Sequence, residues 1–232
     1  MRTKRLAAVV ALLLTATGEE AGDHLPPGGA IAATVLQDLV LLGVAAGLAV
    51  AYGGRVTAML GLRRLPLRRL AGSTAAGAVA LYGVLIAYTL LLQPDGEQDT
   101  LEVLGAKDSA LLLWLTALVV ILLAPVAEEA FFRGLFYGAL RSRLSPVRAA
   151  LATGLLFGAI HYSGPDTLTL LPALAWLGFL FCWLYERTGS LLPSIALHAV
   201  NNAVAVAASG IDGAPAVAAV VLGVVLTAIT VT

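Results

Sequence analysis

The chain has 232 residues, of which 59% are hydrophobic and only 12% are charged, and its formal net charge is zero. Soluble domains carry about 25% charged residues, so this composition excludes an ordinary soluble domain. The balanced charge also gives no basis for binding nucleic acid. Several apolar runs reach the ~20 residues that a helix needs to cross a bilayer. The lone cysteine, Cys182, cannot form a disulfide within the chain and is expected to be a small core residue.

The chain opens with a basic stretch, residues 1–5, and an apolar run from Leu6 to about Thr17. This run is short for a membrane span and is typical of a signal peptide, with a short first membrane helix as the alternative. We assign residues 1–29 to this segment and an external loop. Residues 30–232 are expected to form a single all-α domain, a polytopic bundle of about seven transmembrane helices.

Apolar runs bounded by loops predict the helices of this bundle. The predicted ranges are 30–52, 72–92, 109–140, 149–163, 168–186, 190–209 and 214–231. The loops between them differ in charge, since residues 53–70 and 141–148 carry arginines whereas residues 93–108 are mainly acidic. Cytoplasmic loops of membrane proteins hold an excess of Lys and Arg. We therefore expect the two arginine loops in the cytoplasm and the acidic loop outside.

Three ionisable residues, Glu128, Glu129 and Arg133, interrupt the apolar run from Leu111 to Leu140. A charge at the centre of a membrane helix costs at least ~2.5–3.5 kcal/mol, and such residues usually mark a functional site. On a helix, Glu129 and Arg133 are four residues apart and can pair. Glu128 points about 100° away and lacks that partner. Glu128 is therefore the carboxylate available to take or give a proton, with a purely structural polar cluster as the alternative.

Two histidines, His161 and His198, also lie in predicted spans, and Asn202 follows His198 by four residues on the same helix face. Measured along the helices from the arginines of the predicted cytoplasmic side, Glu128, His161 and His198 lie at depths of about 16–20 Å. A carboxylate, two imidazoles and a carboxamide at one depth could form a hydrolytic site, with a base for water and a donor for an oxyanion. Hydrogen bonds that join helices are the structural alternative.

Asp38 is the other carboxylate within a predicted span. It lies about eight residues, or ~12 Å, from the expected outer end of its helix, so we interpret it as extending to the membrane interface. A site of two paired aspartates is therefore not expected. The chain also lacks a His-Glu-x-x-His zinc motif and a Gly-x-Ser-Gly element for a serine nucleophile.

The three polar elements together resemble the CPBP family of intramembrane proteases, also called ABI, which includes the type II CAAX prenyl endopeptidases. The family pattern is Glu-Glu-x-x-x-Arg, then Phe-x-x-x-His, then His-x-x-x-Asn. In this chain it stands as Glu128 to Arg133, Phe157 to His161, and His198 to Asn202. Order and spacing agree, and the resemblance places the catalytic core within residues 109–209.

The resemblance implies an intramembrane endopeptidase with a conical cavity open to the membrane and the cytosol. It implies that Glu128 and His161 activate water and that His198 and Asn202 hold the oxyanion. The paired glutamate and arginine of the first motif would support the site. The expected location is the cell (inner) membrane of a bacterium. Because bacteria generally lack prenylated proteins, the expected substrate is a membrane-anchored protein or peptide.

The resemblance leaves the role of a metal open. Glu128, His161 and His198 would be the ligands of a zinc ion, since two histidines and a glutamate bind zinc in several enzymes. A zinc-bound histidine normally has its second nitrogen held by a carboxylate or carbonyl, and we expect Glu129 to be committed to Arg133. A zinc-bound Glu128 could not also act as the base. We therefore favour a glutamic-type enzyme without a metal cofactor, with a zinc enzyme as the alternative.

Two functions without catalysis are alternatives to the peptidase. The first is a membrane scaffold or bacteriocin-immunity-type protein of the same family that retains the site residues. The second is a proton-coupled transporter that uses Glu128. A transporter is expected to show inverted repeats or a pair of broken helices, and the sequence shows no such pair.

Overall fold

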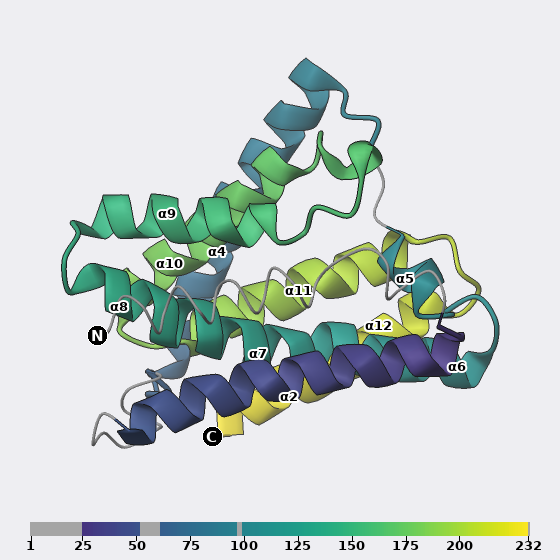
Figure 1. Ribbon diagram of the computed structural model, residues 1–232, viewed down its shortest axis with the longest axis horizontal. Helices are drawn as coiled ribbons and strands as arrows, with labels where there is room; N and C mark the ends of the chain where they lie inside the picture. Colours follow the sequence, from purple (N-terminus) through teal and green to yellow (C-terminus); the bar gives the residue numbers. More distant parts are fainter. Residues whose placement is uncertain (1–24, 52–60, 97–98, 232) are drawn as a thin grey trace.

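The structure is a computed structural model that describes residues 25–51, 61–96 and 99–231, and every regular element in these ranges is helical. Figure 1 shows most of the helices lying lengthwise beside one another, with α4 inclined across the others. In chain order the elements are α2 (Pro27–Ala51), α4 (Leu67–Leu92), α5 (Thr100–Val103), α6 (Ala110–Ala117), η2 (Leu118–Leu123), α7 (Ala124–Glu129), η3 (Ala130–Tyr137), α8 (Gly138–Arg141), α9 (Pro146–Ala159), η4 (Pro165–Thr167), α10 (Leu171–Thr188), α11 (Leu192–Ala208) and α12 (Ala214–Val231). The predicted all-α bundle is confirmed.

Each predicted helix has a counterpart whose ends differ by a few residues. The largest difference is in α4, which begins at Leu67 directly after Pro66 and includes arginines that we had expected in a loop. The prediction for residues 149–163 was wrong at both ends. Helix α9 begins at Pro146, because proline is favoured in the first turn of a helix. It ends at Ala159, so His161 lies in the turn that follows rather than in the helix.

Among the residues that the structure describes, three helices are long and apolar enough to cross a membrane, and three more are apolar but shorter. The long ones are Gly28–Ala51, Leu67–Leu92 and Ala110–Arg141, and the shorter ones are Pro146–Ala159, Leu192–Ala208 and Ala214–Thr230. The protein is thus a helical membrane protein, while the expected count of seven spans and the single domain from residue 30 onward remain predictions. The signal-peptide-like run from Leu6 to Thr17 lies outside the described residues.

The helix Ala110–Arg141 carries the first motif and changes from α to π geometry twice, at η2 and η3. The first change directly precedes Pro125. In a regular α-helix the proline ring would clash with the carbonyl of Ile121, four residues back. In η2 the helix is wider, and the N–H of Ala124 donates to the oxygen of Val119, five residues back. The proline therefore accounts for the local π geometry.

Helices α9 and α10 pack unusually closely because glycines line their contact. A Cβ atom built on Gly154 would lie 2.6 Å from the carbonyl oxygen of Ala175, and one on Gly158 would lie 2.8 Å from that of Leu171. Small residues spaced by four allow helix backbones to approach in this way. The close approach brings Gly178, on α10, within reach of side chains on the first motif's helix.

The two ends of the bundle differ in charge. Every described arginine except Arg133 lies at the end formed by the start of α4, α8, the start of α9 and the end of α10, which we call the arginine end. The opposite end, which we call the acidic end, contains α5, the turn at η4 and the connection from α11 to α12. Its charged described residues are Asp95, Asp99, Glu102, Lys107, Asp108, Asp166 and Asp212. In Figure 1, α8 marks the arginine end at the left and α5 marks the acidic end at the right.

Candidate active site

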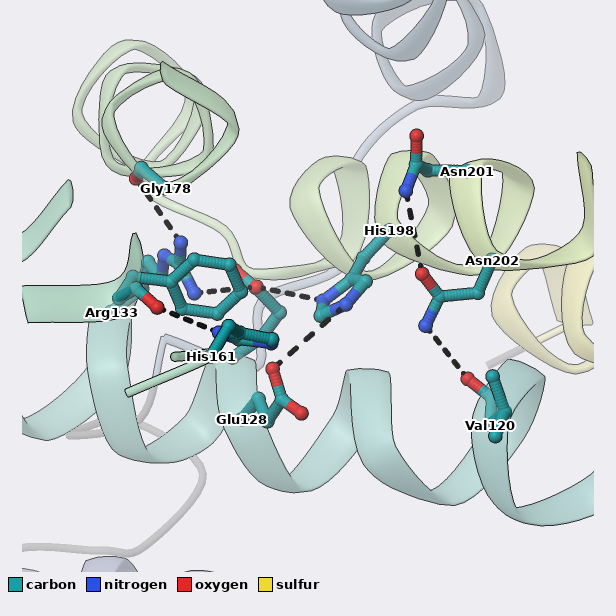
Figure 2. Close-up of polar contacts among 10 residues, drawn as sticks. Val120, Glu128, Arg133, His161, Gly178, His198, Asn201 and Asn202 are labelled. Atoms are coloured by element: carbon teal, nitrogen blue, oxygen red, sulfur yellow. Dashed lines mark hydrogen bonds and ion pairs between the residues drawn. The ribbon is translucent and has the colours of Figure 1, made fainter. Parts of the chain in front are cut away.

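The four residues expected to be catalytic line one cavity of about 680 Å³ inside the bundle. Glu128 comes from α7, His161 from the turn after α9, and His198 and Asn202 from α11. Figure 2 shows these side chains converging between the helix that carries the first motif and α11. The expectation that separate segments bring their polar groups to one depth is therefore correct as a statement of geometry.

Glu128 lines the cavity, and one of its two carboxylate oxygens has no hydrogen-bond partner in the described part of the chain. Its Oε2 atom is buried and has no hydrogen-bond partner among the described residues. The imidazole of His198 lies beside it, with Nε2 3.9 Å from that oxygen (Figure 2). The side chain of Glu128 keeps 17% of its surface exposed. A buried carboxylate oxygen without a partner is costly, so it marks a group held ready for a ligand or a water molecule.

Glu129 makes polar contacts that Glu128 lacks, although its Oε2 atom is also buried without a hydrogen-bond partner among the described residues. Its Oε1 atom accepts a hydrogen bond of 2.8 Å from Nη1 of Arg133 and lies 3.2 Å from Nδ1 of His198. Nη2 of Arg133 donates to the carbonyl of Gly178 at 3.1 Å. Neither the Glu129 nor the Arg133 side chain has any exposed surface. The expectation that Glu129 serves Arg133 alone was wrong, because the same oxygen also holds His198.

The contact with Glu129 fixes the protonation of His198. An ionised carboxylate can only accept, so Nδ1 of His198 must carry a proton. In the neutral ring this leaves Nε2 as an acceptor, directed toward Glu128. Phe181 stacks on the same ring, with centroids 4.9 Å apart and an angle of 27° between the planes. The imidazole of His198 is thus held on one edge and one face.

Aromatic rings enclose the buried guanidinium of Arg133. Its Cζ atom lies 4.5 Å from the ring centroid of Phe157 and 4.8 Å from that of Phe181. A cation over an aromatic ring gains about 2 kcal/mol when both are removed from water. Phe157, the first residue of the second motif, therefore helps to offset the cost of burying a charge beside the site.

His161 is oriented by the end of its own helix. Its Nδ1 lies 2.7 Å from the carbonyl oxygen of Phe157, one turn back, which has lost its regular helical donor because α9 ends at Ala159. A carbonyl only accepts, so Nδ1 carries the proton and Nε2 of His161 is free to accept. The half-buried ring lines the cavity with Glu128, although no hydrogen bond joins the two in the described structure.

Asn202 is anchored to the π-helical segment. Its Nδ2 donates to the carbonyl of Val120 at 2.8 Å, and its Oδ1 accepts from Nδ2 of Asn201 at 3.4 Å (Figure 2). A carboxamide nitrogen has two protons, so one remains for another acceptor. The sequence analysis did not identify Asn201, and its position next to a motif residue is the only signal that could have found it.

Asp38 lies in the same cavity, and the prediction that it extends to the membrane interface was wrong. Asp38 lines the cavity and is only 1% exposed, and its Oδ2 has no hydrogen-bond partner among the residues described. The error came from measuring its depth from the outer end of the helix. Measured from residue 52 at the other end, it lies ~21 Å along the helix, close to the ~20 Å that separates Glu128 from Arg141.

A catalytic zinc ion requires three protein ligands around one point. Among the residues that the structure describes, no three His, Cys, Asp or Glu side chains are grouped in that way. The expected ligand set of Glu128, His161 and His198 therefore does not fit zinc in this arrangement. The argument that His198 lacks a second-shell carboxylate was nevertheless wrong, since Glu129 supplies one. An enzyme without a metal remains a prediction.

The fold and the buried polar cavity define a helical membrane protein with the side chains of a hydrolase. Residues 110–204 match the family model described as Type II CAAX prenyl endopeptidase Rce1-like. The matched segment contains all three motifs, so the chain is similar to that family over these residues, and the predicted resemblance is confirmed. The family supports a protease acting on a protein substrate in the membrane. Comparisons with curated proteins and with solved structures find no match.

Proposed function

We propose that the protein is an intramembrane endopeptidase that hydrolyses a peptide bond in a membrane-anchored protein or peptide of the bacterial cell membrane. The observation that carries the proposal is Glu128, a carboxylate with an oxygen that lacks a hydrogen-bond partner among the described residues, in the lining of a cavity shared with both histidines of the motifs. The match of residues 110–204 to the Rce1-like family supports the same activity.

In the proposed reaction, a water molecule in the cavity gives one proton to Glu128 while its oxygen attacks the scissile carbonyl carbon. Nε2 of His161 can accept a hydrogen bond from the other O–H of that water, because Nδ1 already donates to the carbonyl of Phe157. This hydrogen bond would orient the water for attack on the carbonyl carbon. The carboxyl proton of Glu128 then passes to the leaving amine as the C–N bond breaks. The products are a new carboxylate and a new amine, and the base is regenerated.

The tetrahedral intermediate carries a negative oxygen that needs hydrogen-bond donors. The free amide proton of Asn202 is one of them. His198 can be the second only when both ring nitrogens carry a proton, because the Nδ1–H already donates a hydrogen bond to Glu129 and only an Nε2–H could donate to the oxyanion. Glu129 therefore positions the ring of His198 through the Nδ1 contact, so that Nε2 is directed into the cavity.

The test compares new protein N-termini in cells that express wild-type protein, Glu128→Gln or Glu186→Gln. Glu186 lies at the arginine end in an ion pair with Arg141, so its variant removes the same charge away from the cavity. A set of N-termini from membrane proteins should appear with wild type and Glu186→Gln. The same set should be absent with Glu128→Gln, whose folding is checked by detergent solubility and melting temperature.

Equal N-termini from folded Glu128→Gln and wild-type protein would show that Glu128 is not the base. The absence of any protein-dependent N-terminus would instead favour the scaffold or immunity-type function. Addition of zinc and of a chelator to the same membranes distinguishes the metallo-type alternative.

A further inference from the structure

From the candidate catalytic residues, the lining of the cavity continues along three helices toward one end of the bundle, while Phe157, Leu174 and Leu177 line it beside the motif residues. On the first motif's helix its lining residues Val120 and Ala124 precede Glu128, and on α2 Thr34 precedes Asp38. On α11 the lining continues beyond His198 as far as Ser209. Since α11 runs opposite to the other two helices, all three segments lead toward the acidic end.

The surface-exposed part of the lining lies at the acidic end as well. It consists of Asp99, Thr100, Glu102, Lys107, Ala205 and Ala208. These residues belong to α5, the turn after it, and the last turns of α11. No arginine of the arginine end is among the residues that line the cavity. The mouth of the cavity is therefore formed by α5 and the end of α11, at the right in Figure 1.

Contacts between distant segments show that the arginines share one face of the bundle. Nη2 of Arg69 donates to the carbonyl of Arg187 at 3.2 Å, and Arg141 pairs with Glu186 at 3.0 Å. The hydroxyl of Ser190 donates to the carbonyl of Arg63 at 2.6 Å. The start of α4, α8 and the α10–α11 connection thus lie together, each with arginines in a short connection or at a helix end.

The distribution of positive charge orients such a bundle in the membrane. Short loops rich in Lys and Arg are retained in the cytoplasm, whereas acidic residues contribute little to orientation. Every described arginine outside the site lies at the arginine end, against the single lysine Lys107 at the acidic end. This asymmetry places the arginine end in the cytoplasm and the mouth of the cavity outside. The family resemblance implies a cavity open to the cytosol, and the charge pattern implies cytoplasmic arginine loops. In this fold the two cannot both hold, because the mouth of the cavity and the arginines lie at opposite ends.

We propose that the candidate active site is reached from the extracytoplasmic side, and that its substrates are membrane-anchored polypeptides whose cleaved segment lies on that side. The identity of the substrate class rests on the proposed peptidase function, whereas the direction of access does not. Lipid-modified tails in the cytosol would face the arginine end, where the cavity has no lining residue. The proposal therefore separates this protein from an enzyme that trims prenylated cytosolic proteins.

The test of access uses single cysteines in a Cys182→Ala background, since Cys182 is buried and is the only natural thiol. Asp99→Cys reports the mouth, Ala205→Cys reports the cavity wall, and Arg143→Cys reports the arginine end. Intact cells are treated with a small thiol reagent that cannot cross membranes, and parallel samples are permeabilised first. Positions 99 and 205 should be labelled equally in both samples, and position 143 only after permeabilisation.

Labelling of position 143 in intact cells, or of position 99 only after permeabilisation, would overturn the proposal. Failure of position 205 to react in intact cells while position 99 reacts would show that the cavity is closed to this side, and would also overturn it. The labelling needs no enzymatic activity, so its outcome is independent of the proposed function.

If the peptidase is active, the N-termini that depend on Glu128 should map to extracytoplasmic segments of their parent proteins. Mapping to cytoplasmic segments would contradict the proposed substrates even if the labelling agreed.

Discussion

The two adjacent glutamates of the first motif lie in opposite surroundings. Glu129 belongs to a braced half of the site, in which its Oε1 contacts both Arg133 and His198 and Arg133 reaches the carbonyl of Gly178, although Oε2 of Glu129 and Nε of Arg133 have no partner among the described residues. Glu128 and Asp38 form an open half, in which both residues line the cavity and each has a buried oxygen without a hydrogen-bond partner among the described residues. The comparison separates two uses of charge in a membrane protein. Charges that pair with one another hold the helices in place, and carboxylates that line a cavity without a hydrogen-bond partner are available for chemistry.

The largest expected effect comes from breaking the braced half. Glu129→Ala leaves the guanidinium of Arg133 buried without its carboxylate, and removing one partner of a buried ion pair costs about 3–5 kcal/mol. We expect a clear fall in the melting temperature of the purified protein in detergent, together with loss of activity. Glu128→Gln, which changes the neighbouring residue, is the matched control and should melt at or above the wild-type temperature. Equal melting of Glu129→Ala and wild type would show that the braced half is not structural.

A smaller effect is expected when the spacing of α9 and α10 is changed. The Cβ atom of Gly154→Ala would meet the backbone of Ala175 and Phe179, so α10 must move away. Overpacking of this kind costs about 1–3 kcal/mol. The shift should also lengthen the bond from Arg133 to Gly178 and weaken the braced half from the outside. Gly83→Ala, which has no neighbouring atom within 4 Å of the new Cβ, is the control. The melting temperature of Gly154→Ala should be lower than that of Gly83→Ala. Equal melting temperatures would show that the close contact of Gly154 with α10 does not contribute to stability.

The open half should respond with the opposite sign. Asp38→Asn removes a buried carboxylate that has an unpaired oxygen and faces Glu128 across the cavity. A buried charged group without a partner costs more than a neutral one, so the variant should be stabilised by about 1 kcal/mol. The melting temperature in detergent should rise, and Asp99→Asn at the exposed mouth should leave it unchanged. A fall in melting temperature with Asp38→Asn would mean that its carboxylate has a stabilising partner.

Removal of metal ions is expected to have the smallest effect. Purified protein should contain far less than one equivalent of zinc by elemental analysis, and prolonged treatment with a strong chelator should leave cleavage unchanged. Glu128 would then be free to act as the base. Stoichiometric zinc that is lost together with activity, and restores activity when added back, would establish the metallo-type enzyme and leave the protease assignment intact.

Much of the fold followed from the sequence because long apolar runs are strong signals in a membrane protein. The helix ends were less predictable where arginine or proline stands at the boundary. Arg68 and Arg69 looked like loop residues but belong to α4, and Pro146 begins α9 where we had expected a loop. The glycine contact between α9 and α10 was visible as Gly154-x-x-x-Gly158, but which helix it faces depends on the tertiary structure.

The motif side chains that line the cavity were predicted from the sequence, whereas their mutual contacts, Asp38 and Asn201 were not. Spacing along a helix identifies Glu129 and Arg133 as a pair, but it cannot show that His198, on a different helix, shares the same oxygen. Asp38 was missed because residues on different helices can be compared only when their depths are measured from the same side. Similarly, the direction in which the cavity opens depends on gaps between side chains of several helices, and no single segment contains that information.

The orientation of Asn202 ultimately derives from a missing hydrogen atom in the backbone. The carbonyl of Val120 lies five residues before Pro125, which has no N–H to offer it, and the N–H of Ala124 is used by Val119. The carbonyl of Val120 instead accepts a hydrogen bond from outside the helix, from the amide of Asn202.

Pro125→Ala would supply the missing N–H, which would compete with the asparagine for the same oxygen and free the carboxamide to rotate. A double-mutant cycle with Asn202→Ala should therefore show coupling in melting temperature between two residues that are 77 positions apart in the chain, and additive effects would contradict this link. Pro125, which has no polar side chain, would in this way orient the carboxamide of Asn202.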